Sequence, residues 1–186
     1  LCEYFRRHAS IALAGDVGFI LESATWRASS DWAEKLGYTP AELDRANRDA
    51  IAMLFDLRAE LETPRSPMVI SGCVGPRGDG YDPGQVMSPT EAERYHARQV
   101  RVFAEAGADL VTAITMTNTN EAIGIARAAR AAEMPVVISF TVETDGRLPT
   151  GESLKEAIEA VDAATEGAPA YYMINCAHPM HFADAL

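Results

Sequence analysis

The sequence predicts an α/β fold, a (β/α)8 TIM barrel of which this chain covers roughly strands 2 to 6. Three observations predict it. Short apolar runs alternate with amphipathic helical segments, most of those helices open on a clear start signal, and the nucleotide-binding signatures of an open parallel sheet are missing. Strands that alternate with helices are parallel, because each crossover returns the chain to the same end of the sheet.

Five apolar runs have the length and continuity of strands that are buried on both faces. They cover residues 18–21, 68–74, 110–114, 136–142 and 171–174. A complete barrel has eight strands and typically about 250 residues. The 186 residues of this chain therefore predict one barrel domain over residues 1–186, truncated at both ends.

Helices are expected before the first run and after each of the first four. Three of them begin with a Ser or Thr followed three residues later by Glu, the pattern of a capping box, in which two orphan backbone N–H groups are satisfied. The remaining two rest on apolar periodicity. The capping boxes start at Thr39, Ser88 and Ser153, and the other helices are expected over residues 4–14 and 120–133.

Charge and composition exclude several classes of partner. Sixteen Lys and Arg against 27 Asp and Glu give a net charge of -11, which disfavours nucleic acid. No apolar run approaches the about 20 residues of a membrane-spanning helix, and the N-terminus lacks the order of a signal peptide. We therefore expect a cytoplasmic protein without a membrane partner, and the sequence leaves homo-oligomerisation open.

The three cysteines differ in their positions relative to the predicted strands. Cys2, Cys73 and Cys176 are widely spaced and form no C-x-x-C pair, which argues against a disulfide framework. Cys73 is interpreted as a core thiol. Asn175 and Cys176 stand together at the end of a strand, where a barrel holds its ligands, so Cys176 is a candidate metal ligand or nucleophile.

The histidines, and the acids near the strand ends, indicate a functional site less strongly than Cys176 does. A local zinc site of Cys176, His178 and His181 is disfavoured, because the intervening proline and the short reach prevent convergence. Glu22 and Glu143 are the acids at strand ends that can face a pocket. His8 and His96 lie in helical patterns and are interpreted as surface or packing residues.

Six segments of the sequence resemble the homocysteine S-methyltransferase family, in order and in spacing, over almost the whole chain. Any one segment is weak evidence, whereas the collinear series is strong. The family includes betaine–homocysteine methyltransferase and the homocysteine-binding module of methionine synthase. The segments are GFILESATWRAS, VISGCVGPRGDGY, EAERYHARQVRVFAEAGADLVTAIT, EAIGIARAA, VVISFTVETDGRLPTGESLKEAI and INCAHP.

The resemblance implies a zinc ion held by three cysteines at strand ends, one in an Asn-Cys pair and two in a Gly-Gly-Cys-Cys segment. Cys176 matches the first, and the second segment is not in this sequence. Thiolates hold Zn²⁺ with one position open, where a substrate thiol becomes a nucleophile. The implied partners are a small thiol substrate and a methyl donor of unspecified kind, and the implied reaction methylates homocysteine to methionine.

Two positions depart from the family. Ile114-Thr115 stands where many relatives have Glu-Thr, whose acid binds the amino group of the substrate, and Ser23-Ala24-Thr25 replaces Thr-Asn-Thr. Glu22 is therefore predicted to replace the missing acid. Thr25, Thr115 and Asn175 are expected to contribute to the substrate site, and the substrate is expected to be homocysteine or a similar thiol.

Two other functions compete with methyl transfer. Ile114 and Ala24 suggest a non-catalytic relative that binds a small amino acid, or a regulatory module. A Schiff-base aldolase would need a lysine at a strand end. The lysines of the chain, Lys35 and Lys155, fall in helical or loop stretches instead, which disfavours the aldolase.

Overall fold

A five-stranded parallel sheet forms the centre of the computed structural model, which describes residues 1–183. Neighbours in the sheet are also neighbours in the chain, in the order β1-β2-β3-β4-β5. A doubly wound sheet reverses its strand order at a switch point, whereas a barrel winds in one direction. The predicted barrel-type α/β fold is thus confirmed. The strands are β1 (Phe19–Glu22), β2 (Met68–Val74), β3 (Leu110–Met116), β4 (Val136–Thr141) and β5 (Pro169–Asn175).

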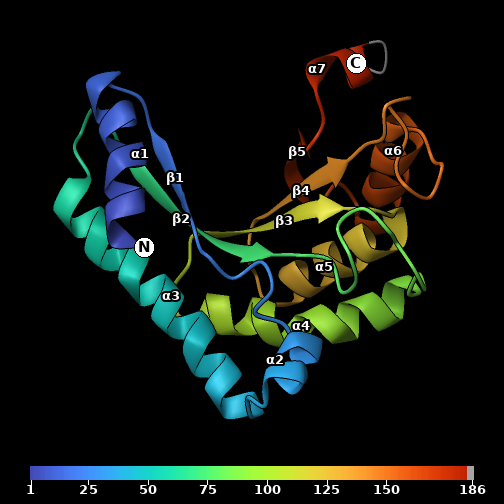
Figure 1. The fold of residues 1–186 in the computed structure, drawn as a ribbon, viewed down its shortest axis with the longest axis horizontal. Helices are drawn as coiled ribbons and strands as arrows, with labels where there is room; N and C mark the ends of the chain where they lie inside the picture. The colour runs from blue at the N-terminus through green and yellow to red at the C-terminus, as the bar shows by residue number, and fades with distance from the viewer. Residues whose placement is uncertain (184–186) are drawn as a thin grey trace.

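The helices form one layer on the outer side of the sheet. In Figure 1, α3, α4 and α5 run below the sheet, while α1 and α6 stand at its two sides. Within residues 1–183 no helix is long and apolar enough to cross a membrane. The helices are α1 (Cys2–Ala14), α2 (Ser30–Leu36), α3 (Pro40–Leu61), α4 (Pro89–Glu105), α5 (Thr119–Ala131), α6 (Leu154–Thr165) and α7 (Pro179–Phe182).

The three predicted capping boxes are present at the starts of α3, α4 and α6. In each, the Ser or Thr hydroxyl accepts from the third backbone N–H of the helix, and the Glu carboxylate accepts from the N–H of the capping residue. Helix α5 is capped by Asn118, whose side chain accepts from the N–H of Glu121. Its start lies within one residue of the prediction.

Two short helices and several strand ends differ from the expectation. Helices α2 and α7 contain only 7 and 4 residues, too few turns for an apolar period to show in the sequence. Strand β1 extends through Glu22, because Glu22 still pairs in register with Ser71 of β2. Glu22 therefore belongs to the strand itself rather than to the loop after it.

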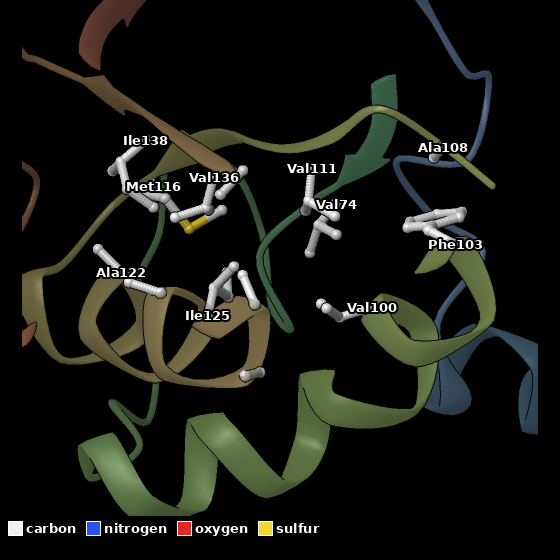
Figure 2. Close-up of a cluster of buried hydrophobic side chains, with 14 of the residues drawn as sticks. Val74, Val100, Phe103, Ala108, Val111, Met116, Ala122, Ile125, Val136 and Ile138 are labelled. Atoms are coloured by element: carbon white, nitrogen blue, oxygen red, sulfur yellow. The ribbon is translucent and has the colours of Figure 1, made fainter. Parts of the chain in front are cut away.

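The two faces of the sheet differ in chemistry. The face toward α4 and α5 is apolar, as Figure 2 shows for the side chains that meet there. Alternate residues of the same strands point the other way, and these include buried polar side chains, as with Ser71 beside Ile70 and Ser139 beside Ile138. The second face is thus mixed, because Cys73 and Val137 lie among these polar groups. The buried side chains on the apolar side include Val74, Val111, Val136, Ile138, Val100, Phe103 and Ile125.

We predict that Gly124→Ala destabilises the fold. A Cβ at Gly124 would lie 2.4 Å from Cβ of Ala92 and 2.6 Å from the backbone nitrogen of Glu93, where α5 crosses α4. Overpacking of this kind lowers the free energy of unfolding by about 1–3 kcal/mol, which outweighs the ~1 kcal/mol that alanine adds as a better helix former. Chemical denaturation measures the change.

The matched control is Asp49→Ala, on an exposed position of α3. It also improves helix propensity but meets no neighbouring helix, so its free energy of unfolding is expected to change by less than about 0.5 kcal/mol. Stabilisation by Gly124→Ala would contradict the close approach of α4 and α5.

Candidate functional site

Cys176 leaves the sheet on a strained turn. It directly follows β5, its backbone has φ of +55°, and its thiol is exposed. Few residues other than glycine adopt this left-handed conformation. Strain of this kind is concentrated at functional sites, where the surrounding structure maintains it. The turn exposes the sulfur atom at the carboxyl end of the strand.

The side chain of Asn175 joins the ends of three strands. Its Nδ2 donates to Cys176 Sγ at 3.1 Å and to Thr115 Oγ1 at 2.8 Å. Its Oδ1 accepts from the backbone N–H of Thr115 at 3.1 Å and from Ser139 Oγ at 2.7 Å. An amide has two N–H donors and two acceptor lone pairs, so these four bonds use its full capacity. Asn175 thereby orients the sulfur of Cys176.

Thr115 adopts an unusual backbone conformation beside Asn175. Its φ is +68°, and the register of β3 against β4 shifts between Ala113 and Met116. A β-branched residue in the left-handed region is a true outlier, and the two hydrogen bonds to Asn175 maintain it. Thr115 is only 4% exposed. Its contact with a substrate stays a prediction.

The loop from β2 to α4, residues 75–88, passes over this cluster. A Cβ at Gly75 would lie 2.3 Å from the carbonyl oxygen of Trp26, and one at Gly80 would lie 3.0 Å from Cγ2 of Thr115. Only glycine fits the first of these contacts. Trp26 is itself fixed, because its Nε1 donates to the carbonyl of Ile114 at 2.9 Å. The loop is thus packed down onto Trp26 and Thr115.

Tyr81 of this loop is influenced by Cys176. The Cys176 thiol raises the pKa of Tyr81, and Tyr81 is 60% exposed. The sequence patterns do not single out Tyr81, which lies in a loop far from Cys176 in the chain. The available signal was the glycine-rich segment GPRGDGY directly after a strand, since binding residues are frequent in such loops.

Glu22 lies on the mixed face of the sheet among hydroxyl groups. Its Oε1 accepts from Ser71 Oγ at 2.8 Å, and Ser71 Oγ is also 2.7 Å from Thr112 Oγ1. Burial raises the pKa of Glu22 to about 7, despite the opposing hydrogen bonds from Ser71 and Thr112. Within residues 1–183 it forms no salt bridge. Glu143, the other candidate acid, is exposed in the turn after β4.

Thr25 is directed toward β2 rather than toward Cys176. It is 2% exposed, and its hydroxyl donates to the carbonyl of Cys73 at 2.7 Å. Ser23 completes the link, because its Oγ accepts from the N–H of Cys73 at 2.9 Å. Burial also raises the pKa of the Cys73 thiol well above its usual range, as expected for an unreactive core cysteine. The substrate contact of Thr25 stays a prediction.

The metal-ligand role of Cys176 stays a prediction. No group of three His, Cys, Asp or Glu side chains within residues 1–183 is placed to hold a metal ion. The ring of His178 accepts instead from the N–H of Met180 and caps α7. Lys35 and Lys155 lie in α2 and α6, away from the strand ends where an aldolase would need a lysine.

The comparisons with known proteins agree with the fold and with the family resemblance of the sequence. A family model described as Homocysteine S-methyltransferase matches residues 4–186. Selenocysteine Se-methyltransferase of Brassica oleracea var. italica is 26% identical over 181 residues, which cover 86% of this chain and 52% of that protein.

Solved structures of the homocysteine methyltransferase MmuM from Escherichia coli share the fold. The metallated form matches with a TM-score of 0.73 and 20% identity over 84% of this chain and 57% of that one. The oxidized form gives 0.72 and 21% over 84% and 56%. The chain spans about half the length of these relatives. Because the family model covers nearly every residue, the chain belongs to the homocysteine S-methyltransferase family.

Proposed function

We propose that the protein is a zinc-dependent S-methyltransferase that methylates the thiol of homocysteine, giving methionine, or of a similar small thiol. Cys176 is the observation that carries the proposal. It is an exposed thiol on a strained turn at the carboxyl end of a barrel strand, in a chain that belongs to a thiol-methylating family. Barrel enzymes place their chemistry at this end of the sheet. Residues 1–186 are then one segment of a single barrel domain.

Cys176 is proposed as one of three thiolate ligands, with the other two supplied outside residues 1–183. Bound zinc would supply the positive charge that keeps a substrate thiol deprotonated near neutral pH. Asn175 directs an N–H group at the Cys176 sulfur and so orients this ligand, as hydrogen bonds behind metal ligands generally do. Thr115 and Ser139 hold the Asn175 amide in turn.

Glu22 is proposed to bind the ammonium group of the substrate. Ile114 places an uncharged side chain on β3 at the position where many relatives carry an acid. Glu22 extends from β1 to the same region, because Thr112 of β3 belongs to its hydrogen-bonded cluster. A carboxylate that has no counter-ion within residues 1–183 and is partly removed from water is well suited to pair with a ligand cation.

The alternative function is a non-catalytic module that binds a small amino acid. Ile114 favours it, because the missing acid weakens the link to the family's usual substrate. Two measurements on the zinc-loaded, full-length protein distinguish the methyltransferase from the binding module. They are calorimetric titration with homocysteine and a methyl-transfer assay. Turnover excludes the module, and binding without turnover for any tested methyl donor supports it.

We predict that Cys176→Ser removes zinc from the full-length protein. A serine hydroxyl is a poor replacement for a soft thiolate. Elemental analysis of the purified protein is expected to find stoichiometric zinc in the parent and little in the variant. Cys2→Ser, on helix α1, is the matched control and should retain the metal. Equal zinc content in the parent and in Cys176→Ser would remove Cys176 from the site.

We predict that homocysteine binding strengthens as the pH rises through about 7. Glu22 is neutral below its raised pKa of about 7 and charged above it, so its attraction for an ammonium group develops over this range. Between pH of about 6 and about 8 the charged fraction increases roughly tenfold. Calorimetry on the parent and on Glu22→Gln measures the effect.

The control ligand for this experiment is 4-mercaptobutyrate, which has the thiol and carboxylate of homocysteine without the ammonium group. Its Kd in the parent and in Glu22→Gln should follow the same pH profile, which reports only the thiol. If homocysteine also gives matching profiles in the two proteins, Glu22 does not bind the ammonium group.

A further inference from the structure

One peptide group in the bulge of β3 is held at both of its polar atoms by side chains. Ile114 and Thr115 lie where the register against β4 shifts, so that two residues of β3 oppose one of β4. The carbonyl of their shared peptide group accepts from Trp26 Nε1 at 2.9 Å, and its N–H donates to Asn175 Oδ1 at 3.1 Å. In a trans peptide group these two atoms point in opposite directions. Trp26 and Asn175 therefore hold one rigid plane from opposite sides.

The orientation in which this peptide group is held is unfavourable for Thr115. The φ of Thr115 is +68°, in a region that β-branched residues avoid. A turn of the peptide plane would restore a negative φ and relieve the strain, but it would break both hydrogen bonds. Strained backbone of this kind persists only where the surrounding structure maintains it. The shape of the bulge thus depends on Trp26 as well as on Asn175.

Trp26 is itself fixed by two of the outer helices. The Nε2 group of Gln99, on α4, donates to the carbonyl of Thr25 and to Asn47 Oδ1, both at 3.1 Å. The Nδ2 group of Asn47, on α3, donates to the carbonyl of Ala28 at 3.1 Å. These bonds hold the backbone on both sides of Trp26, and the amides that make them are buried. The packing of α3 and α4 therefore determines where the indole meets the bulge.

Asn175 connects the same peptide group to the sulfur of Cys176. Two of the four hydrogen bonds of the Asn175 amide are to Thr115, one to its backbone N–H and one to its hydroxyl. A turn of the peptide group displaces both of these partners. The amide would then lose the alignment in which its Nδ2 donates to Cys176 Sγ at 3.1 Å.

We propose that Trp26 is a positioning residue for Cys176. Its indole N–H fixes the Ile114–Thr115 peptide group, this group fixes the amide of Asn175, and the amide orients the sulfur. Each step of this route is a hydrogen bond of the structure. The consequence for zinc rests on the proposed function of Cys176, whereas the route itself does not.

The first test measures hydrogen exchange by NMR in the full-length protein. Trp26→Phe keeps an aromatic ring and removes the N–H donor to Ile114. We expect the backbone amide of Thr115 and the side-chain amide of Asn175 to exchange about fivefold faster, the effect of one lost hydrogen bond. Val111, in the regular part of β3, should keep its parent rate. An unchanged rate at Thr115 or Asn175, or an equal rise at Val111, would overturn the proposal.

Trp32→Phe is the matched control, because it makes the same change at the other tryptophan of the chain. Trp32 lies on α2, where its ring contacts the cations of Arg27 and Lys35. Exchange at Thr115 should stay at the parent rate in this variant. A rise as large as that in Trp26→Phe would show that the indole N–H of Trp26 is not the cause.

Exchange in the unmodified protein gives a check that needs no variant to fold. The Thr115 amide should exchange slowly although it lies in a bulge, because its hydrogen is held by Asn175 on a fixed peptide group. Exchange at the rate of an open loop would overturn the proposed hold on the Ile114–Thr115 peptide group.

The second test measures the Kd of the full-length protein for zinc by competition with a chelator. Trp26→Phe should raise this Kd about tenfold, because groups behind a metal ligand typically change metal affinity by 10–100-fold, and Trp32→Phe should leave it unchanged. An unchanged Kd beside faster exchange at Thr115 would overturn the link to Cys176. A parent protein without zinc would refute the methyltransferase proposal instead, and the exchange test, which needs no metal, would still decide the role of Trp26.

Discussion

The four hydrogen bonds of the Asn175 amide hold together the end of the sheet on which the proposed site depends. They connect β5 to the bulge of β3 and to Ser139 of β4, and they reach the sulfur of Cys176. Two backbone conformations that cost free energy, at Thr115 and at Cys176, are adjacent to this one side chain. Without the amide, neither the bulge that supports the β2–α4 loop nor the direction of the thiol would be maintained.

Polar side chains on the inner face of the sheet explain how the carboxyl group of Glu22 can be buried there. Apolar side chains on the other face pack against α4 and α5 and supply most of the buried apolar surface. The inner face can therefore hold Ser71, Thr112 and Glu22, which form one hydrogen-bonded cluster. Partial removal from water raises the pKa of Glu22 to about 7. A carboxyl group from β1 thus lies close to β3, whose Thr112 belongs to the same cluster.

The loop after β2 links these parts into one arrangement. It is packed onto Trp26 and Thr115 at two glycines and held at Arg77 by Glu121. Residues from the segment after β1, from β3 and from α5 therefore act on the same loop. Barrel enzymes carry their variable functional residues on long loops that follow rigid strands. Here the hydrogen bond from the Arg77 N–H to Glu121 fixes the first part of such a loop.

The sequence alone determined the features that arise from neighbouring residues. Capping boxes at Thr39, Ser88 and Ser153 join residues three apart, and the strands follow from short runs of consecutive apolar residues. Helix starts, the parallel α/β class and the place of Cys176 at a strand end were therefore predictable. Only the tertiary structure decided that Asn175 meets Thr115, sixty residues away, that Glu121 holds the backbone of Arg77, and that Thr25 points toward β2. These contacts depend on strand register and on how a loop packs over the sheet, and neither leaves a periodic pattern in the chain.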